Sequence, residues 1–309
     1  MIIYNELASL EADLGYSAKQ LYSLSNGINR HYHPAEIPKS DGGSRSLSVP
    51  DAQLKAVQSK IADRLLSLED ISVYATAYRP GGSIVRNALP HIGHSDVLKL
   101  DIRRFFDSIT YPLIKEKAFP AKRYSEKNRI LLAILCTYKE ALPQGAPSSP
   151  AISNIILRNL DDAVGSWCRS RYITYTRYCD DMTFSGRIST ALKKEIINTV
   201  EQQLRKAGLY LNADKTVFVH DGQRKCVTGI IVNEKVSIPA GYRRDIRQKM
   251  HYICSYGIKS HIQHTGSKLS EEEYLRKLLG RISFVLSIDP HNEEMLGYRS
   301  KLIEIRRTL

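Results

Sequence analysis

The pattern of apolar and polar residues predicts an α+β fold that ends in an all-helical segment. Strand-like runs and amphipathic helices alternate from about residue 32 to residue 238, and strand-like runs stop near Ala240. Beyond that point the apolar residues recur every three or four positions, as on one face of a helix: Leu275, Leu278, Leu279, Ile282, Val285 and Leu286. With 309 residues, 42% of them hydrophobic and 25% charged, the chain has an ordinary globular composition.

Capping and turn residues mark the helices and strands that are expected in the first third of the chain. Ser17 is a helix-capping residue, Gly42 and Gly43 favour a turn between two strands, and Pro50-Asp51 favours a helix start. The expected elements are a helix over residues 18–24, a hairpin of residues 32–39 and 45–49, a helix from Pro50 with an apolar stripe to Leu68, and a strand over residues 74–78.

From residue 97 to residue 238, the spacing of apolar residues and the intervening turn residues predict further helices and strands. The expected helices cover residues 111–118, 126–138, 151–167 and 192–204. The expected strands cover residues 97–100, 172–177, 182–185, 215–219, 227–232 and 236–238.

Two adjacent carboxylates, Asp180 and Asp181, fall between strand-like runs and are therefore expected at the tip of a β-hairpin. Neighbouring acids repel each other, so folding alone gives no reason to place them together. Mg²⁺ would relieve the repulsion, because it takes hard oxygen ligands and bridges carboxylates to phosphates. With Asp101, which ends the strand-like run 97–100, three acids on two strands suit a two-metal phosphoryl displacement. A solvated turn is the alternative for an isolated Asp-Asp pair.

The net charge and the spacing of the cysteines limit the classes of protein to which the chain can belong. The chain has 45 Lys and Arg against 32 Asp and Glu, a formal net charge of +13. Such a balance is typical of nucleic-acid binding, although solvated lysines give the same number. The five cysteines show no zinc or disulfide spacing, which indicates a reducing compartment. No signal peptide or membrane span is evident, so we expect a cytoplasmic protein without membrane contact.

The motifs occur in a specific order: Asp101 with Phe106, the Pro143-Gln144-Gly145 loop, the Asp180-Asp181 hairpin, and Lys215. In this order and spacing the chain resembles a reverse transcriptase, and within that group a bacterial retron reverse transcriptase. The resemblance runs from about residue 32 to residue 238. It implies a right-hand polymerase with fingers, palm and a short helical thumb. The expected divisions are residues 1–95 for N-terminal helices and fingers, 96–239 for the palm with interleaved fingers segments, and 240–309 for the thumb.

The resemblance also implies roles for the acids. Asp101, Asp180 and Asp181 match the family's catalytic triad, and the backbone carbonyl of Ile102 is expected to join them as a metal ligand. Two Mg²⁺ ions, with Mn²⁺ as a substitute, would activate the primer hydroxyl and hold the triphosphate of a dNTP. Asp107 does not match a metal ligand and is interpreted as structural.

Three further residues match the nucleotide site of the family. Phe106 matches the aromatic gate against a ribose 2′-OH, Gln144 matches a contact to the nucleotide's sugar, and Lys215 matches a proposed general acid toward pyrophosphate. The alternatives are a core phenylalanine beside Phe105, a plain Pro/Gly turn, and a surface lysine.

Lys39 and Arg45 flank the Gly-Gly turn of the expected fingers hairpin, and Arg79 lies on a later loop. Cations at these positions could clamp a triphosphate. Each of them is equally compatible with an ordinary surface charge.

Two short signatures narrow the resemblance to retrons. Asn87-Ala88-Leu89-Pro90-His91 matches an N-A-x-x-H signature, and Val227-Thr228-Gly229 matches a V-T-G signature. We expect Asn87, His91, Val227, Thr228 and Gly229 to contact RNA; loop and strand architecture is the alternative.

In the expected thumb, Arg243, Arg244 and Arg247 lie on a basic helix that suits phosphate contacts. A solvated helix face packed on the palm is the alternative. In retrons the thumb recognises a stem-loop of the cognate non-coding RNA.

The resemblance implies a retron reverse transcriptase that copies part of its non-coding RNA into a branched RNA–DNA product (msDNA), primed from a guanosine 2′-OH, within an anti-phage defence system with a separate effector protein. Two other functions remain open from the sequence: a group II intron-like or other bacterial reverse transcriptase, and a non-catalytic RNA-binding scaffold.

Overall fold

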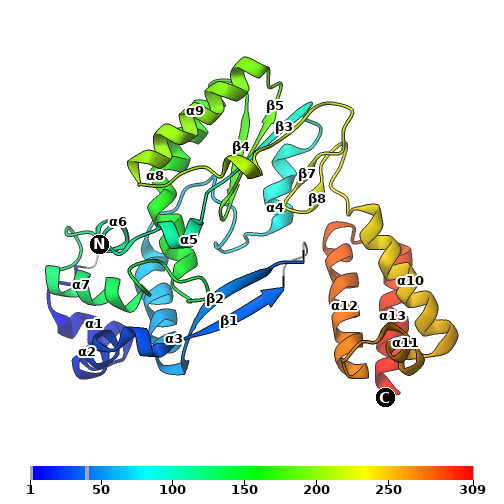
Figure 1. Ribbon diagram of the computed structural model, residues 1–309, viewed down its shortest axis with the longest axis horizontal. Helices are drawn as coiled ribbons and strands as arrows, with labels where there is room; N and C mark the ends of the chain where they lie inside the picture. Colours follow the sequence, from blue (N-terminus) through cyan, green and yellow to red (C-terminus); the bar gives the residue numbers. More distant parts are fainter. Residues whose placement is uncertain (1–2, 39–41, 309) are drawn as a thin grey trace. The chain divides into compact units, whose positions relative to one another are not determined.

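The computed structural model describes residues 3–38 and 42–308 and separates into two compact units (Figure 1). The first unit comprises Met1–Ser83 and Ser95–Asp221, and the second comprises Ile84–His94 and Gly222–Leu309. The short segment Ile84–His94 thus belongs with the C-terminal part of the chain. The division into fingers, palm and thumb at the expected boundaries remains a prediction.

The sheet of the first unit has four antiparallel strands in the order β4-β5-β3-β6. Its strands are β3 (Asp96–Asp101), β4 (Thr174–Tyr178), β5 (Asp181–Gly186) and β6 (Val217–Val219). The β4–β5 hairpin is paired up to Tyr178 and Asp181, which leaves a two-residue turn. Because β3 and β5 are antiparallel, the last residue of β3 and the first residue of β5 meet at the same end of the sheet.

Both faces of this sheet are covered, because most residues of β3, β4 and β5 are buried. Val97 and Leu98 point to opposite faces of β3, and both side chains are fully buried. The long helix α8 (Ser149–Arg169) packs against β4, and α9 (Thr190–Lys206) packs against α8 (Figure 1). Helix α8 buries one apolar face, as its period predicts.

A long hairpin of β1 (Tyr32–Pro38) and β2 (Ser44–Pro50) extends from the first unit. Helix starts have the expected caps: Ser17 forms a capping box with Gln20, and Asp51 accepts a hydrogen bond from the Leu54 N–H. The other helices of this unit are α1 (Leu7–Leu14), α2 (Ala18–Asn26), η1 (Ile28–His31), α3 (Ala52–Lys60), η2 (Ile61–Leu65), η3 (Leu66–Leu68), α5 (Phe105–Ser108), α6 (Tyr111–Lys117), α7 (Glu126–Leu135) and η5 (Ala213–Lys215).

The second unit has its own apolar core, which lies among its C-terminal helices. Those helices are α10 (Ala240–Tyr256), α11 (Ile258–Thr265), α12 (Glu271–Ile288) and α13 (Glu293–Arg307). The unit also contains α4 (Ile84–Ala88), η4 (Leu89–His91) and a small hairpin of β7 (Cys226–Val227) and β8 (Ile230–Ile231). Among the described residues, no helix is both long enough and apolar enough to cross a membrane.

Several expected strands are absent from the structure or shorter than expected. Residues 74–78 form a loop with a single bridge from Ala75 to Arg177. Residues 227–232 form a hairpin rather than one strand, because Thr228 and Gly229 have φ values of 46° and 84° and turn the chain. Residues 236–238 contribute only a bridge at Ser237, and Lys215 precedes its strand on η5.

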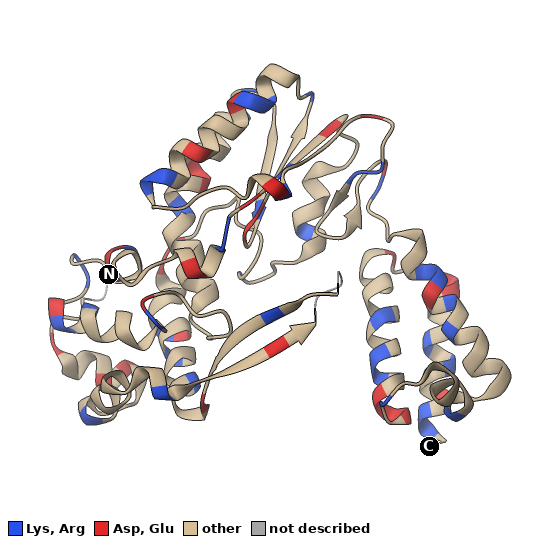
Figure 2. Ribbon diagram, viewed as in Figure 1, with Lys and Arg blue, Asp and Glu red and all other residues tan. Residues whose placement is uncertain are grey.

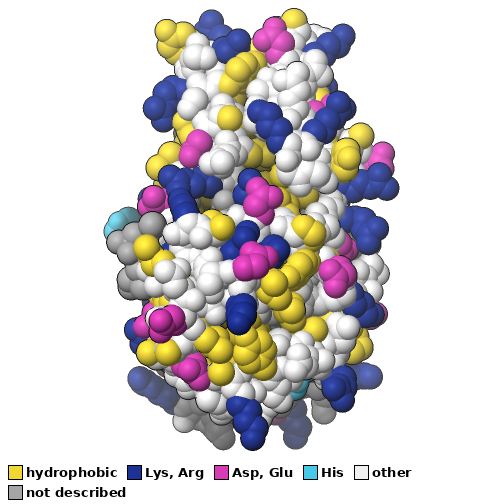
Figure 3. Space-filling model, turned by 90° about the vertical axis from the view of Figure 1, so that its left-hand side faces the viewer, with side chains coloured by type: hydrophobic (Ala, Val, Ile, Leu, Met, Phe, Trp, Pro, Cys, Tyr) yellow, Lys and Arg dark blue, Asp and Glu magenta, His cyan; other side chains and the backbone are white. Residues whose placement is uncertain are grey.

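The basic residues are distributed over both units. Figure 2 shows Lys and Arg on helices throughout the chain, and on the face in Figure 3 they lie scattered among acidic and hydrophobic side chains. Residues 240–309 contain 13 Lys and Arg against 8 Asp and Glu. Net charge alone therefore does not distinguish one face as a binding surface.

Candidate active site

The three acids of the sequence motif meet at one end of the sheet. Asp101 is the last residue of β3 and is paired in register with Asp181, the first residue of β5. Asp180 lies beside it in the β4–β5 turn, where Cys179 has a φ of 61°. The Ile102 N–H donates to the Asp180 carbonyl at 3.2 Å, so the backbone ties the turn to the end of β3. The expected hairpin with its acids at the tip is confirmed as a structural feature.

These acids are crowded and partly withdrawn from water. Asp101 is only 6% exposed, and Asp180 and Asp181 are half-buried. Burial raises the pKa of Asp181, and the nearby charges of Asp180 and Asp101 raise it further, against the opposing effect of Lys99 and Lys215. The site therefore carries concentrated negative charge that a cation would stabilise.

Lys215 supplies one such cation. Its Nζ lies 3.1 Å from Asp101 Oδ2, and the side chain is 61% exposed. Partial burial lowers the pKa of Lys215, but the hydrogen bond and the charge of Asp101 outweigh this effect and raise it overall. Asn212 donates from Nδ2 to Asp101 Oδ1 at 3.3 Å, and its N–H donates to the Asp101 carbonyl at 2.8 Å. Both oxygens of Asp101 thus have a partner from the η5 segment.

The donor set suits a hard divalent cation, because it consists of carboxylates; burial and then their mutual repulsion raise the pKa of Asp181. In the described part of the chain, no group of three His, Cys, Asp or Glu side chains is gathered closely enough to hold an ion as it stands. Asp101 is instead turned toward Lys215. A metal ion would have to compete with that ion pair for Asp101.

A cavity of about 750 Å³ opens beside the acids, a size within the usual range for small-molecule sites. Of the residues singled out in the sequence, it brings together Arg45, Asp101, Ile102, Phe106, Gln144, Asp180 and Lys215. A second cavity of about 290 Å³ shares Phe106, Gln144 and Tyr78 with it. The two cavities lie within the first unit.

Backbone contacts fix the Gln144 loop against the β1–β2 hairpin. The Ser48 N–H of β2 donates to the Gln144 carbonyl at 2.8 Å. Gly145 has a φ of 129°, and a Cβ there would lie 2.9 Å from the Ser48 carbonyl oxygen. Only glycine fits this close approach, which is the physical reason for glycine at position 145.

Phe106 is half-buried on α5, and its ring lies 5.2 Å from that of Phe105, which is buried in the core. One ring therefore anchors the short helix while the other lines the cavity.

Two expected phosphate ligands do not join this group. The Arg79 guanidinium donates to the carbonyls of Ser72 and Ala75, both at 3.1 Å, and Arg79 does not line the cavity. It holds the 72–79 loop, and a phosphate contact by Arg79 stays a prediction. Lys39 lies outside the described residues.

The two short retron signatures pack against each other in the second unit. Asn87 Nδ2 lies 3.4 Å from Thr228 Oγ1, which in turn donates to the Ile84 carbonyl at 3.1 Å. Asn87, His91 and Val227 are fully buried, and burial lowers the pKa of His91 to about 3, helped by the charge of His94. These three side chains pack in the interior of the unit, and direct RNA contact by the signature residues stays a prediction. Gly229 turns the β7–β8 hairpin.

The basic face of α10 is partly neutralised by acids. Arg247 Nε lies 2.6 Å from Glu294 Oε1, and Lys249 Nζ lies 2.5 Å from Asp245 Oδ2. Arg244 is exposed and Arg243 is half-buried. Of the three arginines expected to contact RNA, Arg244 and Arg247 are exposed, and Arg247 is held in the ion pair with Glu294.

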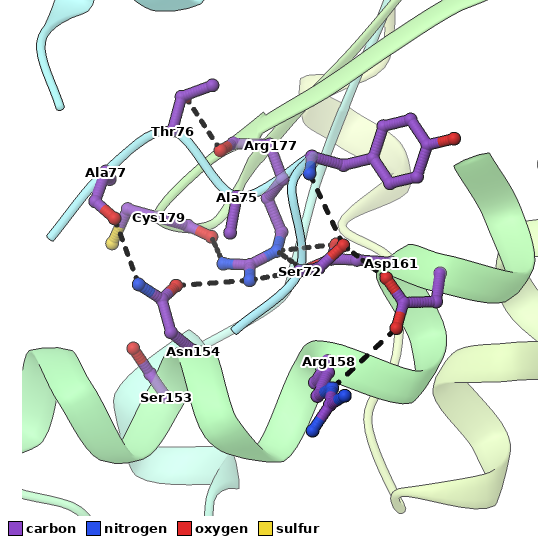
Figure 4. A network of polar contacts seen from close by, with 12 residues as sticks. Ser72, Ala75, Thr76, Ala77, Ser153, Asn154, Arg158, Asp161, Arg177 and Cys179 are labelled. Atoms are coloured by element: carbon purple, nitrogen blue, oxygen red, sulfur yellow. Dashed lines mark hydrogen bonds and ion pairs between the residues drawn. The ribbon is translucent and has the colours of Figure 1, made fainter. Parts of the chain in front are cut away.

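A buried network behind the turn was missed in the sequence (Figure 4). Arg177 of β4 and Asp161 of α8 are both 0% exposed, and Arg177 Nη2 lies 2.6 Å from Asp161 Oδ2. Arg177 also donates to the Asn154 side chain at 3.2 Å and to the Cys179 carbonyl at 2.8 Å. Tyr175 donates its hydroxyl to Asp161 Oδ1 at 2.8 Å. The pair is therefore hydrogen-bonded on all sides, and it holds the residue that precedes Asp180.

Tyr78 was also missed, because the loop that carries it was expected to be a strand. It lines both cavities, and its hydroxyl donates to Cys179 Sγ at 3.3 Å. Burial raises the pKa of Tyr78, with further effects from Cys179 and Asp180, so the hydroxyl stays protonated at neutral pH.

The raised pKa of Asp181 leads to a prediction about stability. A folded-state pKa above the unfolded value means that this group's contribution is present below the unfolded pKa and is lost as the pH rises through the folded value. At neutral pH the ionised Asp181 therefore opposes folding. We expect Asp181→Asn to raise the melting temperature at neutral pH, in metal-free buffer, with the gain shrinking as the pH falls.

Thermal melting over a pH series would check this, with Asp214→Asn as the control for losing an exposed acid on η5. A lower melting temperature for Asp181→Asn that does not depend on pH would contradict the electrostatic account.

The chain is similar to proteins of known class. A family model described as reverse transcriptase (RNA-dependent DNA polymerase) matches residues 37–275. The Retron Mx65 reverse transcriptase of Myxococcus xanthus is 32% identical over 291 residues, which cover 88% of this chain and 65% of that protein. The Retron Ec86 reverse transcriptase of Escherichia coli is 33% identical over 265 residues, covering 84% of this chain and 76% of that protein.

Among solved structures, a telomerase from Candida albicans in complex with a TWJ fragment of telomeric RNA matches with a TM-score of 0.50. It is 13% identical, and the match covers 91% of this chain and 62% of that chain. At this identity the likeness concerns the fold, which is the right-hand polymerase fold with its antiparallel sheet.

Proposed function

The chain belongs to the reverse transcriptase family, and on this premise we propose that it is an RNA-directed DNA polymerase of the retron type. The observation that carries the proposal is the single cavity shared by Asp101, Asp180, Lys215, Phe106 and Gln144. Acids, a cation, an aromatic ring and a loop amide at one cavity are the groups needed to bind a deoxynucleoside triphosphate and to transfer its phosphoryl group.

In this proposal the incoming dNTP occupies the 750 Å³ cavity. Phe106 lies beside the 2′ position of the sugar and excludes a hydroxyl there, while Gln144 contacts the sugar from the fixed loop. Arg45, exposed on β2 at the cavity wall, meets the triphosphate as a charged hydrogen-bond donor.

The divalent ions, Mg²⁺ first and Mn²⁺ as a substitute, would be held by Asp101, Asp180, Asp181 and the Ile102 carbonyl. When bound, such ions lower the pKa of an attacking hydroxyl and neutralise developing charge on the phosphates. Lys215 is kept protonated beside Asp101 by its raised pKa, so it holds a proton that the departing pyrophosphate can accept.

The retron assignment adds a specific RNA. We propose that the template is a cognate non-coding RNA, that synthesis starts from the 2′-OH of a guanosine in that RNA, and that the product is msDNA. A separate effector protein and a role in anti-phage defence complete the proposal. The Asn87–His91 and Val227–Gly229 signatures and the similarity to two retron enzymes support it.

Primer extension tests the polymerase part. The purified chain, given an RNA template, an annealed DNA primer, dNTPs and Mg²⁺, is expected to extend the primer to the template end. Omission of the divalent ion, or its removal by EDTA, should stop extension. A chain that binds the primed RNA but adds no nucleotide under any divalent ion would refute the proposal and favour an RNA-binding scaffold.

The position of Phe106 predicts its role in sugar selection. We expect Phe106→Ala to raise incorporation of ribonucleotides relative to deoxynucleotides by about 10- to 100-fold, because removing the ring opens space for a 2′-OH. Single-nucleotide extension with matched dNTP and rNTP would measure the ratio. An unchanged ratio with retained dNTP use would mean that Phe106 is only a packing residue.

A further inference from the structure

Tyr78 has an unusual backbone conformation for a residue with a bulky side chain. Its φ is 56°, in the left-handed region, where a large side chain is unfavourable and glycine is the usual residue. The side chain is 46% exposed, so it contributes little to the buried core. Folding alone therefore does not account for a tyrosine at this position, and strained residues of this kind cluster at functional sites.

The loop is fixed on both sides of Tyr78. On one side, the Ala77 carbonyl accepts a hydrogen bond of 2.9 Å from the Asn154 side chain of α8 (Figure 4). On the other side, the Arg79 guanidinium donates to two carbonyls of the same loop, both at 3.1 Å. These contacts hold the backbone of Tyr78 in its left-handed conformation, and with it the starting direction of the side chain.

The side chain of Tyr78 lies between the two cavities of the first unit and reaches the turn that carries the acids. It lines the cavity of about 750 Å³ together with Cys179 and Asp180, and the cavity of about 290 Å³ together with Gln144. Its hydroxyl donates to Cys179 Sγ at 3.3 Å. Cys179 is itself in the left-handed region, with a φ of 61°. The hydroxyl therefore contacts the strained residue that directly precedes Asp180.

Cys179 is held at two points by two different segments of the chain. Arg177 of β4 donates to its carbonyl at 2.8 Å, and Tyr78 of the preceding loop donates to its sulfur. A rotation of the turn would break at least one of these hydrogen bonds. Because Asp180 follows directly, the two contacts limit the positions that its carboxylate can take.

We propose that Tyr78 is a positioning residue for the metal site and acts through Cys179 rather than by contact with the nucleotide. Its hydroxyl holds the β4–β5 turn in the conformation in which Asp180 can join Asp101 and Asp181 around a divalent ion. This inference rests on the proposed function, because it concerns the ions of the polymerase site. Residues that orient metal ligands raise the affinity for the ion, since less ordering is then needed on binding.

Tyr78→Phe tests the role of the hydroxyl, because it keeps the ring and removes only the group that contacts Cys179. The metal-free full chain is titrated with Mn²⁺, and the bound ion is measured by electron paramagnetic resonance. Binding that is lost in the variant with both Asp180→Asn and Asp181→Asn identifies the ions at this site. We expect Tyr78→Phe to raise the Kd of these ions by about 3- to 10-fold, the effect of losing one hydrogen bond.

Primer extension gives an independent measure of the same effect. For Tyr78→Phe, the Mg²⁺ concentration that gives half of the maximal rate should rise by about 3- to 10-fold as well. The KM for the dNTP, measured at saturating Mg²⁺, should stay unchanged, because the hydroxyl does not contact the nucleotide in this proposal.

A second substitution shows whether Tyr78 acts through Cys179. In a Cys179→Ala background, Tyr78→Phe should have no further effect on Mn²⁺ binding, because the sulfur that accepts the hydrogen bond is already absent. Cys179→Ser supplies another acceptor and should keep the dependence on Tyr78. Tyr172→Phe is the matched control, because Tyr172 is 93% exposed and precedes β4 at the end away from the turn. It should change neither Mn²⁺ binding nor the Mg²⁺ requirement.

Unchanged Mn²⁺ binding by Tyr78→Phe, or an effect of equal size in the wild-type and Cys179→Ala backgrounds, would overturn the proposal. A raised KM for the dNTP with unchanged Mn²⁺ binding would also overturn it, because Tyr78 would then contact the nucleotide. Primer extension by the wild type keeps the two proposals apart. An active wild type whose Mn²⁺ binding does not depend on Tyr78 refutes only the positioning role, whereas Mn²⁺ binding that depends on Tyr78 in a chain that makes no DNA refutes the proposed function.

Discussion

Replacing both acids of the β4–β5 turn, as Asp180→Asn with Asp181→Asn, is expected to reduce DNA synthesis by at least about 1,000-fold while RNA binding persists. The amide side chains keep the size of the carboxylates but lose the charge that a divalent ion requires. Because ionised Asp181 opposes folding at neutral pH, the variant should be at least as stable as the wild type. Primer extension, RNA-binding affinity and thermal melting, measured on one preparation, would check all three parts.

The control for this pair is Asp214→Asn, which removes an exposed acid next to Lys215 and should leave synthesis close to the wild-type level. Full synthesis by the doubly substituted variant would show that the reaction is carried by other groups, and the site would have to be sought elsewhere.

The second large effect concerns the buried pair of Arg177 and Asp161. We expect Arg177→Met to destabilise the first unit by about 3–5 kcal/mol, because Asp161 is left buried without its partner. The melting temperature should fall by roughly 10 °C. Arg177→Met combined with Asp161→Leu should recover part of the loss, since both charges are then absent.

An exposed pair gives the contrast. Glu201→Ala breaks the ion pair with Arg205 on α9, which is 3.4 Å long and solvent-exposed, and should cost at most about 0.5 kcal/mol. Equal effects of Arg177→Met and Glu201→Ala would contradict the structural role of the buried pair. Arg177→Met also tests how the β4–β5 turn is held, because Arg177 donates a hydrogen bond to the Cys179 carbonyl next to Asp180.

The sequence predicted those helices and strands that depend on residues close together in the chain. Alternating or continuous apolar runs, capping residues and Gly-rich turns predicted both main hairpins and most helices, including α8 and α10. Asp101 and Asp181 could be placed together because they end and begin strands, and the structure pairs them in register.

Features that depend on distant partners could not be predicted. Arg177 reads as an ordinary strand residue, and only the fold shows that Asp161 and Asn154 of α8 enclose it. In the same way, Asn87 and Thr228 lie 141 residues apart in the chain, and only the fold shows that they contact each other. The 74–78 segment has strand composition but is held as a loop by Arg79 and by one bridge to β4.

The proposed retron function is tested most directly by identifying the nucleic acid that the protein synthesises. The protein should be produced together with the non-coding RNA encoded beside its gene, and the bound nucleic acid treated with RNase and with a debranching enzyme. We predict a short DNA whose mobility changes on debranching, as expected for DNA joined to RNA through a guanosine 2′-OH. A protein free of DNA that extends any primed RNA equally well would contradict the retron assignment, and a protein that makes no DNA on any template would contradict the polymerase itself.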